Sequence, residues 1–108
     1  MVSHQIKTAV IIVTHNSEKF IKKAWDCLEK QTKRPDLTFI VDSGSTCTDY
    51  LSFLMDKPSV KVILAGKDIG FCKGNNIGFK EVPKEFDYVV LVNPDAFLTP
   101  RYIEEAVI

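Results

Sequence analysis

The run Thr8–Thr14 constrains the fold of this chain more than any other segment. Its interior is apolar and largely β-branched, and it stops abruptly at the polar residues His15 and Asn16. A run this short and this continuously apolar is typical of a strand that is buried on both faces. Such strands occur in parallel sheets whose two faces are covered by helices. The run therefore predicts a central strand of a layered α/β domain.

The rest of the chain alternates helix-like and strand-like segments with short connections. Three strands are predicted after the first, at 37–41, 60–65 and 87–92. Helices are predicted between them: one that follows residues 16–17 and ends near Thr32, one that begins at 46–50 and ends before Pro58, and one that opens within 66–78 and reaches Val82. A last helix is predicted at 102–107. This alternation predicts an α/β fold with a mainly parallel sheet, flanking helices and right-handed crossovers.

Local signals predict how the helices begin and what they bury. Asn16 and Ser17 have side chains that suit the N-cap of the first helix, and residues 46–49 have the spacing of a capping box. Phe20 and Trp25 share one face of the first helix, which predicts that both lie in the core.

Composition narrows the class of protein. The chain has 108 residues, which fits a single domain over residues 1–108. It carries 14 basic and 14 acidic side chains, so net charge gives no reason to expect a nucleic-acid partner. Its apolar stretches are too short to cross a bilayer. Its three cysteines form no CxxC pair, which indicates reduced thiols in a cytosolic protein.

Polar clusters follow directly on three of the predicted strands. They are Thr14-His15-Asn16, Asp42-Ser43-Gly44 and Asn93-Pro94-Asp95. Because the carboxyl ends of parallel strands meet at one edge of a sheet, we expect the clusters to form a ligand site there. Each cluster also has a structural interpretation as a turn or a helix cap. A flavodoxin-like or receiver-like domain shares the alternation, but predicts acidic residues where the first cluster stands.

Four segments resemble one family in their order and spacing. Residues 13–17 (V-T-H-N-S) resemble the first-strand motif V-T-Y-N of family 2 glycosyltransferases, and residues 41–46 (V-D-S-G-S-T) resemble their V-D-[DN]-G-S-T turn. Residues 68–78 (D-I-G-F-C-K-G-N-N-I-G) and 91–95 (L-V-N-P-D) resemble N-x-G-F-x-x-G-N-N-x-G and L-x-N-P-D of the rhamnosyltransferase-like branch. The resemblance covers the chain from about Thr8 to its end.

The resemblance implies the Rossmann-like, nucleotide-binding half of a GT-A fold, with a nucleoside-diphosphate sugar as its ligand. His15 replaces the usual Tyr, and its ring can still stack on a base. Ser43 replaces the acidic or amide residue that hydrogen-bonds the pyrimidine, and its hydroxyl can donate or accept. Gly70–Gly78 is interpreted as a loop that leads backbone N–H groups to the phosphates. The implied binding residues are Thr14, His15, Asn16, Asp42, Ser43, Gly70, Lys73, Asn75, Asn76, Asn93 and Asp95.

Asp95 is the residue to which the resemblance assigns a metal. A carboxylate at the end of a central strand can hold Mg²⁺ or Mn²⁺, which bridges the diphosphate and stabilises the leaving nucleotide. Asn93 stands where the first Asp of the family's D-x-D motif would be, so only one carboxylate is available.

The resemblance also implies a reaction: inverting transfer of a sugar from dTDP-rhamnose, or from a UDP-sugar, to a glycan or lipid-linked acceptor. The general base is expected beyond Ile108, so the chain is expected to be truncated and to hold no catalytic residue. The expected location is the cytoplasm, with peripheral attachment at the inner membrane face. The open sheet edge left by truncation favours a homo-oligomer. A non-catalytic nucleotide-binding module remains the alternative.

Overall fold

The structure is a computed structural model that describes residues 6–107. Its four strands form one parallel sheet in the order β3-β2-β1-β4. They are β1 (Thr8–Thr14), β2 (Leu37–Asp42), β3 (Val60–Leu64) and β4 (Tyr88–Leu91). The chain places β2 and β3 successively on one side of β1 and then crosses to the other side for β4. The predicted parallel α/β fold is confirmed, and the strand order reverses between β1 and β4.

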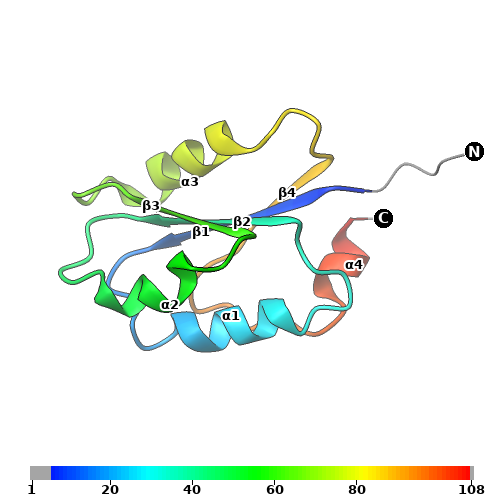
Figure 1. Ribbon diagram of the computed structural model, residues 1–108, viewed down its shortest axis with the longest axis horizontal. Helices are drawn as coiled ribbons and strands as arrows, with labels where there is room; N and C mark the ends of the chain where they lie inside the picture. Colours follow the sequence, from blue (N-terminus) through cyan, green and yellow to red (C-terminus); the bar gives the residue numbers. More distant parts are fainter. Residues whose placement is uncertain (1–5, 108) are drawn as a thin grey trace, which may run out of the picture.

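Helices cover both faces of the sheet (Figure 1). Their bounds are α1 (Ile21–Glu29), the 3₁₀ turn η1 (Asp49–Leu51), α2 (Ser52–Met55), α3 (Gly70–Glu81) and α4 (Tyr102–Ala106). One face carries α3, and the opposite face carries α1, α2 and α4. Each face has its own apolar core, because side chains along a buried strand point alternately to the two sides.

The first strand behaves as its sequence predicts, because every residue of β1 is buried. Val10 and Ile12 pack against the α1 and α2 face, whereas Ala9 and Ile11 belong to the core under α3. The β1 register pairs Thr14 with Asp42 of β2, so these two polar residues end neighbouring strands side by side.

The start of the first helix differs from the prediction. The residue at the N-cap of α1 is Phe20, and no side chain caps the helix. A turn precedes it, in which the carbonyl of Ser17 accepts the N–H groups of Phe20 and Ile21 at 3.0 Å. Asn16 and Ser17 are therefore not caps. Phe20 is 44% exposed, so its prediction as a core residue is wrong, whereas Trp25 is buried as expected.

Two further local predictions are wrong. The predicted capping box does not form, because Thr48 precedes a 3₁₀ turn and no side chain caps it. The segment Gly70–Gly78 is not a loop but most of α3, which begins at Gly70 itself. Two of its glycines lie against the sheet instead of facing a ligand. A Cβ on Gly74 would lie 2.8 Å from Val13 Cγ1, and one on Gly78 would lie 2.7 Å from Ile11 Cγ2.

We expect Gly74→Ala to destabilise the chain by about 1 kcal/mol. Alanine gains about 1 kcal/mol of helix propensity over glycine, but overpacking against Val13 costs about 1–3 kcal/mol. Urea unfolding measures the net change in the free energy of unfolding. The double variant with Val13→Ala removes both clashing methyl groups, so its loss should be smaller than the sum of the two single losses. If the losses of the two single variants simply add in the double variant, the close approach of α3 to Val13 does not restrict the residue at position 74.

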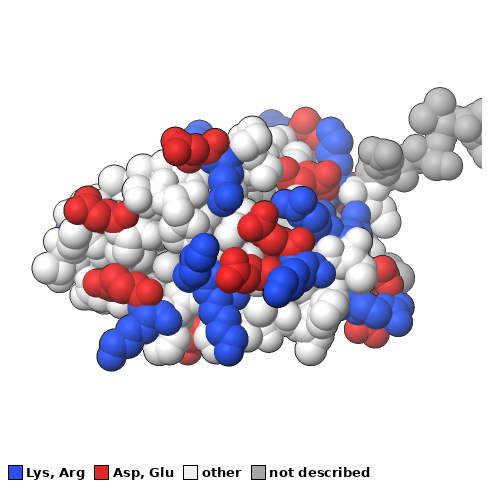
Figure 2. Space-filling model, turned by 60° about the horizontal axis from the view of Figure 1, so that its bottom comes forward, with Lys and Arg blue, Asp and Glu red and all other residues white. Residues whose placement is uncertain are grey.

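Charged side chains of both signs are interspersed over the face that α1 and α2 cover, as Figure 2 shows. Exposed pairs such as Arg34 with Glu29 contribute to this pattern. Within residues 6–107, no helix is long and apolar enough to cross a membrane.

Candidate functional site

An open pocket of about 260 Å³ lies at the carboxyl ends of the strands. It is built by the ends of β1 and β2, the loop that leads from β3 into α3, and the loop after β4. Its lining residues are Val13, Thr14, His15, Ser17, Ser43, Asp68, Gly70, Phe71 and Pro94. The pocket therefore brings together residues from all three predicted polar clusters, at the reversal of strand order where ligands of open α/β sheets bind.

Behind this pocket, Asp42 organises a buried polar network. Its carboxylate is 1% exposed and accepts hydrogen bonds from Thr14 Oγ1 at 2.8 Å, from the Ser45 N–H at 2.9 Å and from the Tyr50 hydroxyl at 3.2 Å. The Ser45 hydroxyl donates to the same carboxylate. These residues, Thr14, Asp42, Ser45 and Tyr50, are the Asp42 network. Buried carboxylates need such partners, so Asp42 holds the first two polar loops together.

Asn16 joins the same two loops from the outside. Its backbone adopts a left-handed conformation (φ 49°), which Asn tolerates better than most residues. Its N–H donates to Ser45 Oγ, and its side-chain oxygen accepts the N–H of Thr46, both at 2.8 Å. Asn16 thus connects the two loops through its backbone and its side chain.

The ring of His15 is fixed at the mouth of the pocket. Its Nδ1 lies 2.5 Å from the carbonyl oxygen of Ser43, and a carbonyl can only accept, so Nδ1 carries a proton. In the neutral ring Nε2 is then an acceptor, and the Asn16 amide nitrogen lies 3.5 Å from it. The carbonyl of Ser43, in the second polar cluster, therefore sets the tautomer of the His15 ring, in the first cluster.

Ser43 links the second cluster to the loop before α3. Its hydroxyl donates to Asp68 Oδ1 at 3.0 Å and accepts the N–H groups of Ile69 at 2.8 Å and Gly70 at 3.2 Å. The bond from Ser43 and then the bond from the Gly70 N–H hold the pKa of the Asp68 carboxyl below its ordinary value, against an opposing effect of burial. Asp68 is therefore an ionised acceptor at the pocket.

Gly44 allows these two loops to touch. Its φ is 66°, and a Cβ there would lie 2.4 Å from the Asp68 nitrogen and 2.5 Å from the Lys67 carbonyl carbon. Both neighbours are backbone atoms, which cannot rotate away. The contact sets how near Asp68 lies to the ends of the strands.

The remaining predicted residues lie elsewhere. Lys73 and Asn76 line a second hollow of about 360 Å³ along α3, together with Lys67 and Lys80. Asn75 is buried and donates to the carbonyl of Phe71 at 3.1 Å, within the helix. Of the predicted α3 residues, Gly70 alone is among the residues that line the strand-end pocket.

The loop after β4 offers few ligands for a cation. Asn93 and Asp95 are exposed, on either side of Pro94, which lines the pocket. Among residues 6–107, no group of three His, Cys, Asp or Glu side chains is placed to hold a metal ion. One carboxylate and one amide oxygen fit Mg²⁺ or Mn²⁺ only where phosphates and water complete the coordination.

The predicted binding residues leave out five residues that line the pocket, namely Val13, Ser17, Asp68, Phe71 and Pro94. For Phe71 the sequence leaves open whether its ring lies in the core or in the pocket, and the structure places it in the pocket. Ser17 was interpreted as a helix cap, but its hydroxyl donates to the carbonyl of His15 at 3.3 Å. Asp68 and Phe71 stand at the N and F positions of the N-x-G-F motif. The motif was therefore a usable signal, although it does not reveal which side chains face a ligand.

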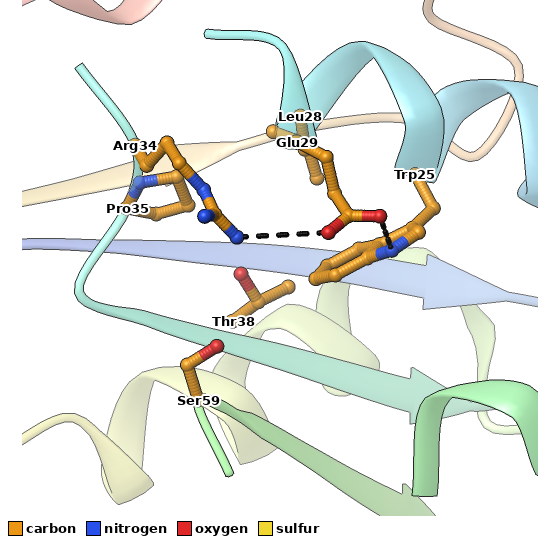
Figure 3. A pocket seen from close by; sticks show the side chains of 7 residues that line it. All are labelled: Trp25, Leu28, Glu29, Arg34, Pro35, Thr38 and Ser59. Carbon is orange, nitrogen blue, oxygen red and sulfur yellow. Dashed lines mark hydrogen bonds and ion pairs between the residues drawn. The ribbon is translucent and has the colours of Figure 1, made fainter. Parts of the chain in front are cut away.

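Figure 3 shows a crevice at the other end of the sheet, near the start of β2 and before β3. Trp25 Nε1 donates to Glu29 at 2.9 Å there, and Arg34 lies 3.7 Å from the same carboxylate. Its volume of about 10 Å³ is that of a single water molecule, so it does not compete as a ligand site.

The family profile described as Glycosyl transferase family 2 matches residues 9–107. The chain belongs to this family. The match removes the flavodoxin-like and receiver-like alternatives, and no curated protein matches the chain significantly.

Solved structures of S. aureus TarS resemble this family 2 domain. TarS 1–349 is 27% identical, with a TM-score of 0.78, and the match covers 94% of this chain and 31% of TarS 1–349. TarS 1–349 in complex with UDP gives the same values. Its complex with UDP-GlcNAc gives a TM-score of 0.79 and 27% identity, over 94% of this chain and 30% of that one. The fold is that of a GT-A glycosyltransferase, and the chain spans about a third of these relatives.

Proposed function

We propose that the strand-end pocket binds the nucleotide of a nucleoside-diphosphate sugar, as the donor site of a glycosyltransferase. The supporting observation is the pocket itself, where His15, Ser43 and Asp68 meet at the reversal of strand order. The structures of the similar TarS with UDP and UDP-GlcNAc favour a UDP-sugar over dTDP-rhamnose as the donor.

The pocket offers a base both ring surfaces and polar groups. His15 and Phe71 both line it, and Phe71 is 51% exposed. Aromatic rings stack on a base with about 1–3 kcal/mol per base. Beyond the Gly70 N–H, which Ser43 and Asp68 already accept, the first turn of α3 supplies further backbone N–H groups and the positive end of a 12-residue helix, which suits the diphosphate. Thr14, Asn16 and Asp42 support these groups from behind.

A divalent cation is part of this proposal. Asp95, with Asn93 beside it in the loop after β4, would hold Mg²⁺ or Mn²⁺ together with the phosphates. When bound, the cation supplies charge stabilisation for the departing nucleoside diphosphate. Lys73, Asn75 and Asn76 are placed by α3 outside the groups that line the pocket, so we assign them no direct role with the base.

The reaction we propose for the whole protein is inverting sugar transfer to a hydroxyl of a glycan or a lipid-linked acceptor, at the cytoplasmic side of a membrane. Such a displacement needs a general base beside the acceptor. No residue of the strand-end pocket is assigned that role, so the chain itself is proposed as a donor-binding domain. The non-catalytic binding module predicts the same donor site.

Calorimetric titration with UDP and with dTDP, each with and without Mn²⁺, tests the donor site. We expect UDP to bind, and Mn²⁺ to increase its affinity. Asp95→Asn should remove roughly tenfold or more of that increase, because one charged ligand of the cation is lost. Asp56→Asn removes the same charge from an exposed residue at the end of α2, before β3, and should change nothing.

A folded chain that binds neither nucleotide would refute the donor site. An Asp95→Asn variant with the full effect of Mn²⁺ would refute the metal assignment alone. Tighter binding of dTDP than of UDP would restore dTDP-rhamnose as the preferred donor.

A further inference from the structure

The hydrogen-bonding capacity of the Ser43 hydroxyl is fully used inside the protein. A hydroxyl has one donor and two acceptor positions. Ser43 donates to Asp68 Oδ1 and accepts the N–H groups of Ile69 and Gly70, and it is only 2% exposed. It therefore has no capacity left for a base, although it occupies the position where the family's pyrimidine contact is expected.

The other two hydroxyls that line the pocket, those of Thr14 and Ser17, belong to buried residues and donate within the protein. Thr14 donates to Asp42 at 2.8 Å, within the Asp42 network. Ser17 donates to the carbonyl of His15 and accepts the N–H of His15 at 3.1 Å. The ring of His15 uses Nδ1 on the carbonyl of Ser43 and has Asn16 beside Nε2. Because all three hydroxyls belong to buried residues, an acceptor for the edge of a base must come from a more exposed side chain.

The carboxylate of Asp68 has an acceptor oxygen, Oδ2, that residues 6–107 do not use. Its Oδ1 accepts the Ser43 hydroxyl and the N–H of Gly70 at 3.1 Å. Its Oδ2 has no hydrogen-bond partner among the described residues, and Asp68 is an exposed residue that lines the pocket. Two bonds through Oδ1 fix the carboxylate group and leave Oδ2 available to a ligand.

We infer that Asp68 is the specificity residue of the donor site: its Oδ2 accepts the imide N3–H of a uracil or thymine base, and Ser43 positions it. This rests on the proposed function. Uracil and thymine present a donor at N3, whereas cytosine presents a lone pair there, which a carboxylate repels. A site built to accept a hydrogen bond rejects a ligand that lacks the donor. The site therefore selects uridine and thymidine diphosphates over cytidine diphosphate.

Titrations of the chain with UDP and with CDP test the inference. The parent chain should bind UDP at least about tenfold more tightly than CDP, the size expected for a hydrogen bond to a charged group. Asp68→Asn should reduce this ratio about tenfold or more. The Asn oxygen keeps the bonds from Ser43 and Gly70, so the amide N–H₂ takes the place of Oδ2 and donates to N3 of cytosine.

The ratio is the decisive quantity, because removal of a negative charge near a diphosphate favours both nucleotides alike. Asp56→Asn is the matched control and should leave the ratio unchanged, and circular dichroism confirms that each variant is folded. Equal binding of UDP and CDP by the parent overturns the inference, as does an unchanged ratio in Asp68→Asn, and in either case nucleotide binding itself stands. A folded parent that binds neither nucleotide overturns the proposed function and the inference with it.

Discussion

Gly44→Ala is expected to lower the free energy of unfolding by about 3 kcal/mol. The left-handed backbone costs an L-residue about 1–2 kcal/mol. The new Cβ would also lie 2.4 Å from the Asp68 nitrogen, and overpacking costs typically about 1–3 kcal/mol. Relief requires the loop that carries Asp68 to move away from the ends of the strands. Nucleotide binding should therefore weaken together with stability, which urea unfolding and calorimetry measure.

Gly66→Ala is the matched control for this prediction. Gly66 has a similar φ of 79°, but a Cβ there meets nothing within 4 Å. It carries the conformational cost without the collision, so we expect a loss of about 1 kcal/mol and unchanged nucleotide affinity. If both variants lose the same free energy of unfolding, the close approach of Gly44 to Asp68 does not contribute to the destabilisation of Gly44→Ala.

Asp42→Ala is expected to cost about 3 kcal/mol, because it removes the acceptor at the centre of the Asp42 network. The hydroxyls of Thr14, Ser45 and Tyr50 and the N–H of Ser45 would lose their bonds to this carboxylate. A buried donor left without a partner costs about 1–3 kcal/mol, and rearrangement recovers part of the sum. Nucleotide affinity should fall with and without Mn²⁺, because the loops that carry His15 and Ser43 lose their connection.

Tyr50→Phe removes a single donor from the same network and serves as the comparison. We expect it to cost about 1 kcal/mol and to leave nucleotide affinity nearly unchanged, since Ser45 and Thr14 still hold the carboxylate. Wild-type stability in Asp42→Ala, with affinity alone reduced, would instead indicate that Asp42 contacts the ligand directly.

The layout of the fold was predictable from the sequence. The continuous apolar run of β1 requires burial on both faces, and that requires a parallel sheet between two layers of helices. Polar residues placed directly after Thr14, Asp42 and Val92 had to meet at one edge, because parallel strands share a direction. Three of the four segments that resemble family 2 contribute to one pocket through these strand ends. The fourth contributes through Asp68, Gly70 and Phe71.

Only the tertiary structure decided which polar side chains of the pocket bond to one another and which remain available to a ligand. The sequence places Asn16, Asp42 and Ser43 at the site, but it does not show that their hydrogen bonds are satisfied by one another. It presents Gly74 and Gly78 as a phosphate loop, whereas helix packing against Val13 and Ile11 uses them. Local patterns follow from the geometry of one chain segment. Which polar atom remains free for a ligand, here on Asp68, depends on partners more than 20 residues away and exists only once the loops have met.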